Sequence, residues 1–527
     1  MAEYISQSAD LPNEDGEKRY EVVMLASGVD GIVVDDASPL PVTSVPTGSS
    51  TTAFGENYGL TITPVIQLEA VYGLNADRWN TYTAVSGSVT TPNSAFVLES
   101  GTSQNGYATI QTRRTLRYRS GQGALCRFTG AFENPAAGYT QRAGLGSLEN
   151  ALQVGYNGTS FGVLRATGGK AEIWHLTINN PATGSETVTI NLNSVAYTVS
   201  VTAGTVAQNA AKIANATFTG WNASSHDSHV HFQRQSLGPA AGTYSISSTG
   251  TLTGTLTQLN AGVVQTENWT YQQNFNIDKL DGTGPSGMVI DPSKLNVYQI
   301  NFRWLGAGEI RYGIEDEATG NMIFFHHDHY VNKNSTPHLI NPSMKIQYVA
   351  ASVGGTGTNV KTTGCSVMGA IEGDIIVTYL PNSVSNTYST SILAATHQHM
   401  LSIRNDIVFN NKINQREIIL KGISAAANSA SSSPIVVTLY KNSTTAGLKI
   451  WSNIGNDSFT SYSTTDTTII PASDLVVYQA VIIPGAANVL DVSNLRIALP
   501  PGDYMSVGVY GSNNIQNCAV SLIWVED

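Results

Sequence analysis

Histidines at alternate positions are the side chains of this protein best suited to hold a metal ion. Two pairs have the pattern His-x-His, and a third group surrounds Asp328: His229/His231, His397/His399, and His326 with His327 and His329. Residues i and i+2 of a strand point to the same side, so each pair could offer two imidazoles to one ion. Imidazoles that are hydrogen-bonded within the fold or exposed to water are the alternative. We take His397 and His399 as the candidate metal ligands.

Three other patterns resemble catalytic or cofactor sites but lack the elements that such sites need. Residues 158–162, GTSFG, match the nucleophile elbow of serine hydrolases, but Ser160 is predicted in the second strand of a hairpin and not between a strand and a helix. Residues 282–287, GTGPSG, match a dinucleotide fingerprint, but an extended segment follows them. The acidic residues 315–317 fall in a predicted turn, where solvated charges are expected and not the paired carboxylates of a glycosidase. We predict no enzyme and no cofactor.

The segments around these residues have the period of two that a half-buried strand requires. Residues 124–132 alternate in this way, and residues 297–305 place aromatic and aliphatic side chains on one face. Residues 151–156 and 159–165 flank an Asn-Gly pair, which suits a type I′ hairpin turn. Antiparallel strands of this kind and number favour a concanavalin-like or jelly-roll sandwich.

Residues 176 to about 266 differ from the sequence on either side. A second hairpin is predicted around Asn193-Ser194, and the capping box formed by Thr205 and Gln208 opens an amphipathic helix. No other segment is a convincing helix. Because strand patterning of the earlier kind resumes after it, we interpret this region as a small α+β module inserted into the sandwich.

The predicted fold class is therefore all-β, with sandwiches and one inserted α+β module. Residues 1–60 form an extended arm that docks on a larger particle, with a disordered tail as the alternative. Residues 61–383 form the sandwich with its insert. The segment PNSVSNTYSTS near residue 380 is typical of a linker, and residues 384–527 form a second, jelly-roll-like sandwich.

The composition excludes several classes of function. Charged residues make up 12% of the chain, about half of the ~25% typical of soluble proteins, and the net charge is −11. Binding to nucleic acid by counterion release needs many clustered Lys and Arg. We therefore expect no nucleic-acid partner. The single basic group, Arg113, Arg114, Arg117 and Arg119, is predicted to lie on a solvated or subunit-facing strand. No apolar segment suggests secretion or membrane insertion, and three scattered cysteines suggest reduced thiols.

Four segments resemble virion structural proteins of tailed bacteriophages and of some large DNA viruses. They are GQGALCRFTGAF at 121–132, AGLG at 143–146, LQVGYNGTSFGVLRATGG at 152–169, and residues 281–316. The resemblance covers the middle of the chain well and the ends less well. It implies an architectural and non-enzymatic protein of the tail, baseplate or fibre apparatus, located in the virion and assembled in the host cytoplasm.

The resemblance also sets expectations about partners. It implies other virion proteins and further copies of this chain, with a trimer as the first expectation, and a host surface glycan in attachment. In some trimeric phage fibres, His-x-His pairs near the axis bind iron with six nitrogens from three chains, which is a further reason to consider His397 and His399. The alternatives are a capsid decoration or head-fibre protein, and a carbohydrate-binding receptor protein or tailspike glycosidase.

Overall fold

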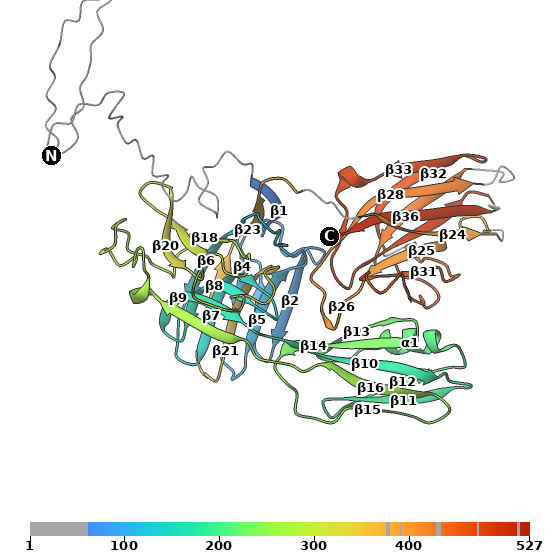
Figure 1. Cartoon of the computed structure of the whole chain (residues 1–527), viewed down its shortest axis with the longest axis horizontal. Coiled ribbons are helices and arrows are strands. Elements are labelled where there is room, and N and C mark those ends of the chain that lie inside the picture. Colours follow the sequence, from blue (N-terminus) through green and yellow to red (C-terminus); the bar gives the residue numbers. More distant parts are fainter. Residues whose placement is uncertain (1–61, 376–379, 390–391, 428–433, 472–473, 514–516) are drawn as a thin grey trace, which may run out of the picture. The chain divides into compact units, whose positions relative to one another are not determined.

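The computed structural model of the chain describes residues 62–375, 380–389, 392–427, 434–471, 474–513 and 517–527 (Figure 1). Antiparallel β-sheets dominate these residues, which confirms the predicted all-β class with sandwich architecture. The predicted N-terminal arm, residues 1–60, lies outside the described residues. No helix in the described part of the chain is both long and apolar enough to cross a bilayer.

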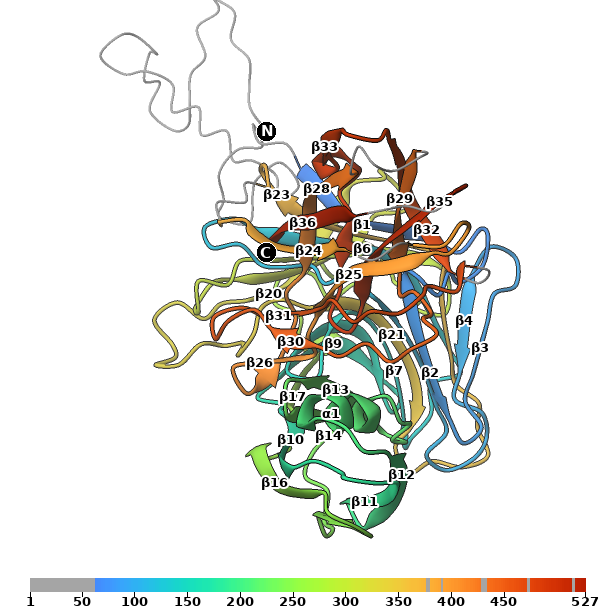
Figure 2. The ribbon, with the colours of Figure 1, turned by 90° about the vertical axis from the view of Figure 1, so that its right-hand side faces the viewer.

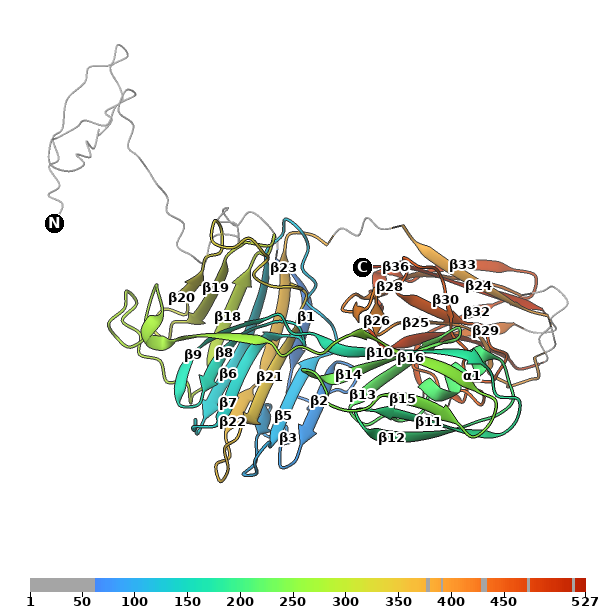
Figure 3. The same ribbon diagram turned by 60° about the horizontal axis from the view of Figure 1, so that its bottom comes forward.

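Two large sheets form the first sandwich, which we call the central sandwich, and Figure 3 shows them as two layers. The nine strands of one sheet are β1 (Ile62–Glu69), β3 (Ser88–Thr90), β4 (Phe96–Glu99), β6 (Ala124–Glu133), β18 (Asn296–Phe302), β19 (Ile310–Glu315), β20 (Met322–Asp328), β22 (Lys361–Gly364) and β23 (Ser366–Glu372). The seven strands of the other are β2 (Trp79–Ala84), β5 (Tyr107–Thr112), β7 (Tyr139–Gly146), β8 (Ala151–Asn157), β9 (Ser160–Thr167), β17 (Thr266–Tyr271) and β21 (Lys345–Ser352).

Aromatic side chains from both sheets meet in the core between them. The ring of Tyr348 on β21 contacts Phe96 on β4 edge to face, with centroids 4.8 Å apart, and Phe128 on β6 with centroids 6.0 Å apart. Its hydroxyl donates a hydrogen bond to the carbonyl of Thr129 at 2.7 Å. Burying such a side chain stabilises a fold by about 1.5–3 kcal/mol, so these rings hold the two sheets together.

Two strand ends differ from the sequence prediction. The strand predicted to reach residue 305 ends at Phe302, because Leu305 (φ 37°) and Gly306 (φ 83°) turn the chain. In the predicted hairpin, Asn157 pairs with Ser160, so the loop consists of Gly158 and Thr159. Gly158 has the positive φ of 64° that the turn requires. The hairpin is confirmed, with its loop shifted by one residue.

The inserted module comprises residues 171–260. Four strands form one of its sheets: β10 (Ala171–Asn180), β13 (Trp221–His226), β14 (His229–Leu237) and β16 (Thr253–Asn260). Three form the other: β11 (Glu186–Leu192), β12 (Val195–Val201) and β15 (Ser245–Ser248). The chain leaves the central sandwich after β9 and returns as β17, and these two strands are paired neighbours. The insertion therefore leaves the seven-stranded sheet continuous.

The helix α1 (Val206–Ala214) packs against β13 and β14 of the inserted module (Figure 2). Both halves of the predicted capping box are present, between Thr205 and Gln208. Ala210 and Ile213 are fully buried, as the predicted apolar face requires. Short 3-10 turns also occur in the described residues, among them Gln272–Asn274 and Ser493–Leu495.

The C-terminal sandwich has its own core around Trp524. One sheet contains β24 (Asn382–Tyr388), β28 (Ile418–Ala427), β33 (Ala487–Asp491), β34 (Ala498–Leu499) and β36 (Cys518–Glu526). The other contains β25 (Gln398–Asn405), β29 (Ile435–Lys441), β30 (Ser452–Asn453), β31 (Thr460–Ser463), β32 (Leu475–Ile482) and β35 (Tyr504–Gly511), and β26 (Val408–Phe409) and β27 (Lys412–Ile413) form a separate hairpin. The predicted linker near residue 380 is wrong for 382–388, because β24 pairs along its whole length with β36.

The four clustered arginines bind carboxylates of the C-terminal sandwich. Arg113 pairs with Asp503, Arg114 with Glu417 at 2.9 Å, and Arg117 and Arg119 both pair with Asp527. The prediction of a solvated or subunit-facing strand was wrong, because these side chains pair within the same chain. Their partners lie about 300–410 residues further along it. We call this set of ion pairs the arginine seam.

Candidate functional site

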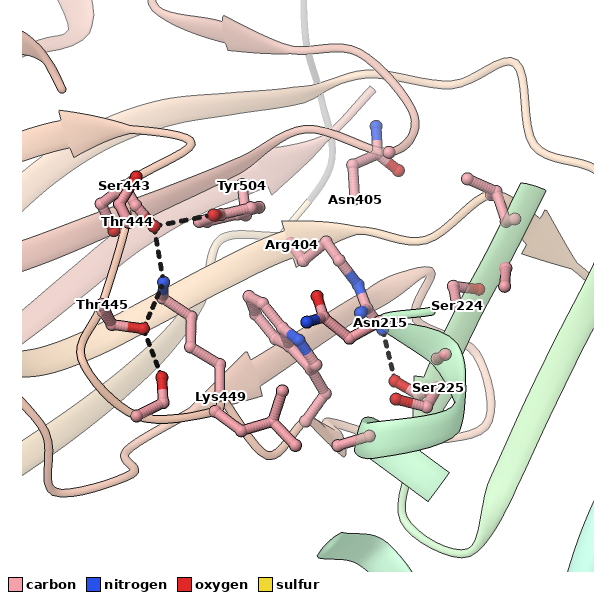
Figure 4. A pocket seen from close by; sticks show the side chains of 18 residues that line it. Asn215, Ser224, Ser225, Arg404, Asn405, Ser443, Thr444, Thr445, Lys449 and Tyr504 are labelled. Carbon is pink, nitrogen blue, oxygen red and sulfur yellow. Dashed lines mark hydrogen bonds between the residues drawn. The ribbon is translucent and has the colours of Figure 1, made fainter. Parts of the chain in front are cut away.

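A pocket of about 410 Å³ lies where the inserted module meets the C-terminal sandwich (Figure 4). The module contributes the end of α1 and β13, including Asn215 and Ser225. The sandwich contributes the end of β25, the start of β35, and the loop of residues 443–451 that follows β29. Residues more than 200 positions apart in the sequence therefore form one concave surface.

Lys449 is the cation of this pocket that lacks a carboxylate partner. Its side chain is buried, and Nζ donates to the carbonyl of Ser443 at 2.8 Å and to Oγ1 of Thr445 at 3.4 Å (Figure 4). The ammonium also lies 4.7 Å from the centre of the Tyr504 ring. In the described part of the chain Lys449 forms no ion pair; the carboxylate whose charge acts on it is Asp474, which accepts from the backbone amide of Thr444 at 2.9 Å. Burial lowers the pKa of Lys449 to about 8, so the amine is mostly charged at neutral pH and favours an anionic partner.

Arg404, on the other side of the pocket, has its charge balanced within the protein. Its Nε donates to Oδ1 of Asp406 at 2.9 Å, and a terminal nitrogen donates to the carbonyl of Ser225 at 2.6 Å. The guanidinium lies 4.4 Å from the centre of the Trp451 ring. Arg404 thus connects β25 to β13, and a cation lies over one face of the Trp451 ring and of the Tyr504 ring.

The predicted metal ligands His397 and His399 have protein partners within this chain. His397 precedes β25, stacks on Tyr510 with ring centroids 4.0 Å apart, and bonds through Nδ1 to the Tyr440 hydroxyl at 2.7 Å. His399 is buried, with Nδ1 at 2.8 Å from the Thr465 carbonyl and Nε2 at 2.7 Å from Oγ of Ser402. Burial lowers the pKa of His399 to about 4. A shared metal at this pair stays a prediction, and it would require His399 to give up one of these contacts.

The pair His229/His231 belongs to a cluster of four imidazoles on three strands of the inserted module. His175 of β10 stacks on His231 with centroids 4.8 Å apart, and its Nε2 lies 3.0 Å from Nδ1 of His229. His226 of β13 lies 5.5 and 5.3 Å from the rings of His229 and His231. Burial, followed by the neighbouring imidazoles, lowers the pKa of His175 to about 4 and that of His231 to about 3. His175 and His231 are therefore neutral at neutral pH.

The third group, His326 with His327 and His329, divides between two partners. His326 is buried and lies 3.2 Å from Oδ1 of Asp328. His327 and His329 instead face the carboxylate of Glu309, with Nδ1 at 3.2 and 3.4 Å from Oε1. Sequence reasoning missed Glu309 because it lies 18 residues before His327. The alternation of Ile310, Tyr312 and Ile314 was the available signal, because it indicates a strand, and a hairpin with the following strand brings the two segments together.

The three motifs that resemble catalytic or cofactor sites lie in strands, loops and turns. Ser160 is exposed at the start of β9. Residues 282–287 form a loop held by Asp278, which accepts from the backbone amides of Leu280 and Ser286 at 2.8 Å each, and strand β18 follows. Asp316 accepts from the Thr319 hydroxyl at 2.7 Å within a turn. None of the three has the helix or facing carboxylate that its chemistry needs among the described residues.

Comparisons with known proteins give no family assignment. No family model matches the sequence, and no curated protein is significantly similar to it. One solved structure that it matches is a lectin from Bauhinia forficata in complex with GalNAc. The match has 10% identity, covers 58% of this chain and 98% of the lectin, and has a TM-score of 0.20. A similarity of that size says nothing about function.

Proposed function

We propose that this protein is a non-enzymatic structural component of a tailed-phage particle, in the tail, baseplate or fibre apparatus. The observation that carries the proposal is the resemblance of residues 121–132, 143–146, 152–169 and 281–316 to virion proteins. These segments supply β6, β7, β8, β9, β18 and β19, which are core strands of both sheets of the central sandwich. The segments that carry the resemblance therefore belong to the scaffold of the fold, which supports a structural role in the particle.

Further copies of this chain and other virion proteins are the partners that this role requires. The surface supports such packing, because only 12% of residues are charged and the described strands expose apolar side chains such as Val481 and Val489. We expect a homo-oligomer, with a trimer as the first expectation. A decoration or head-fibre protein of the capsid is the alternative that shares this architecture.

We further propose that the pocket beside Lys449 contributes to host attachment by binding a carboxylated saccharide. The buried ammonium supplies the positive charge for a sugar carboxylate, and the hydroxyls of Thr444 and Thr445, which line the pocket, supply donors and acceptors for ring hydroxyls. A volume of about 410 Å³ fits one or two sugar units. The same geometry disfavours a neutral glycan, which would leave the ammonium without an anionic partner.

Binding to immobilised glycans tests this part of the proposal. The wild-type chain should bind sialylated or uronic-acid glycans in preference to neutral ones, and Lys449→Gln should weaken that binding about ten- to hundredfold, since a hydrogen bond to a charged group contributes roughly 1.5–3 kcal/mol. The control is Lys412→Gln, which removes the same charge from an exposed position on β27. Equal binding by both variants would contradict the pocket assignment. Release of shortened saccharides would instead indicate a spike glycosidase.

A further inference from the structure

We propose that Glu309, His327 and His329 form a binding site for a divalent transition-metal ion of the Zn²⁺ type. These residues are the one group of three or more His, Cys, Asp or Glu in the described part of the chain whose ligand atoms all lie within 4.8 Å of one another. The site lies in the central sandwich and shares no residue with the pocket between the inserted module and the C-terminal sandwich, so it is independent of the saccharide proposal.

The hairpin of β19 and β20 brings the three side chains together. Arg311 of β19 pairs with His327 of β20, and Ile310 pairs with Asp328. Glu309 directly precedes the first of these strands and His329 directly follows the second, so both lie at the same end of the hairpin. His327 and His329 are two residues apart and converge on one carboxylate oxygen.

The distances match those between neighbouring ligands of one metal ion. Nδ1 of His327 and Nδ1 of His329 lie 3.2 and 3.4 Å from Oε1 of Glu309. Bonds of about 2.0–2.1 Å at tetrahedral angles separate adjacent ligand atoms by roughly 3.3–3.4 Å. Two imidazoles and one carboxylate form a common ligand set for Zn²⁺ and similar ions, and they leave a fourth position for water.

The neighbouring side chains orient the carboxylate. Nε of Arg311 donates to Oε2 of Glu309 at 2.8 Å, and Arg303 approaches the same oxygen at 3.8 Å. The other oxygen, Oε1, is thereby directed to the two imidazoles. The two guanidinium charges also oppose a cation, so we expect weaker binding than at an all-neutral shell of the same ligands.

The three ligands differ in exposure, and the most exposed one leaves the ion a route from solvent. Glu309 is 8% and His327 20% exposed at the side chain, while His329 is 55% exposed. The inner two ligands are thus fixed by packing, and the outer one can close over the ion from the solvent side. The alternative arrangement, in which protonated imidazoles pair with Glu309 without a metal, is an outcome of the experiment below.

Calorimetric titration of the chelator-treated full-length protein with Zn²⁺, and the visible absorption spectrum with Co²⁺, test the proposal. We expect one ion per chain, and at least about tenfold weaker binding in His329→Ala and in Glu309→Gln. The matched control is Glu315→Gln, which removes an exposed carboxylate at the other end of β19, and His397→Ala tests the pair in the C-terminal sandwich. Circular dichroism checks that each variant is folded.

Two results would overturn the assignment. One is the absence of saturable Zn²⁺ binding by the wild-type chain, which would leave Glu309 as the ion-pair partner of its arginines and histidines. The other is binding that persists in His329→Ala and is lost in His397→Ala, which would place the metal at the His397/His399 pair. Because the saccharide pocket contains none of these residues, failure here leaves the Lys449 result unchanged.

Discussion

Lowering the pH from 7 to 4.5 should destabilise the inserted module and loosen its contact with the C-terminal sandwich. The four-histidine cluster is the cause. Folding holds the pKa of His231 at about 3 and that of His175 at about 4, against 6.5 for an unperturbed histidine. In the unfolded chain these two histidines take up protons as the pH falls below about 6.5, whereas in the folded protein they do not until about pH 3–4. Stability is therefore complete above pH 6.5 and is lost progressively below it.

The size of this loss follows from the shift at His231. At ~1.36 kcal/mol per pKa unit, His231 alone would cost on the order of 2–3 kcal/mol at pH 4.5. The charged and titratable groups that face this ring are His175, His226 and His229 of its own sheet and Arg404 of the C-terminal sandwich. All of these are cations when protonated, so none of them compensates a new charge. The carboxylate of Asp227 lies 3.5 Å from Nδ1 of His226 and acts on His229, and it is not among the groups that act on His231.

Thermal unfolding measured between pH 7 and pH 4.5 checks this prediction. The variant His231→Phe keeps a ring that can stack on His175 but cannot take a proton, so its melting temperature should fall less than that of the wild type over this interval. Glu186, whose folded pKa is lowered from 4.5 to about 2, begins to lose its stabilising contribution only near pH 4.5, and it does so equally in both proteins, so it does not affect the difference. Parallel curves for the two proteins would show that the cluster does not set the acid sensitivity.

Removing the carboxylate of Asp527 should uncouple the C-terminal sandwich from the central sandwich. Its two oxygens pair with Arg117 and Arg119, whose side chains are 21% and 14% exposed. Asp527→Asn leaves both guanidinium groups without that anion. Breaking a buried pair costs about 3–5 kcal/mol, and the partial exposure here lowers the expectation to about 2–4 kcal/mol.

Differential scanning calorimetry is the measurement for this variant. The wild type should unfold its two sandwiches in a coupled transition, and Asp527→Asn should separate an earlier transition for the C-terminal sandwich. The control is Asp491→Asn, which changes an exposed carboxylate of the same sandwich that caps the amide of Ser493. An unchanged thermogram for Asp527→Asn would show that the arginine seam contributes little to the coupling.

Local patterns in the sequence were sufficient for several elements of the fold. The alternation at residues 124–132 gives β6, the loop Asn193-Ser194 has the positive φ angles of 55° and 61° of its turn, and the capping box at Thr205 begins α1. Each of these depends on neighbours within a few residues, which the sequence displays directly. The strand β24 was missed because its Ser and Asn residues have a low intrinsic preference for strands, and its pairing with β36 about 130 residues away decides its conformation.

The candidate sites depend on contacts that the sequence does not display. Lys449 has no local feature that distinguishes it from an exposed lysine, since its burial arises from the loop that folds back over Tyr504. Arg113 and its neighbours formed a recognisable basic group, but their partners lie in another sandwich. The histidine patterns were visible, yet only the pairing of β19 with β20 brings Glu309 to His327.

The measurement that tests the proposed function most directly is immunogold electron microscopy of purified phage particles, with antibodies raised against the recombinant chain. The particles come from a host culture that produces this protein. We expect gold label on the tail, baseplate or fibres of intact particles. Label on the capsid would support the decoration or head-fibre alternative, and the absence of label on both intact and disrupted particles would contradict a structural role in the virion.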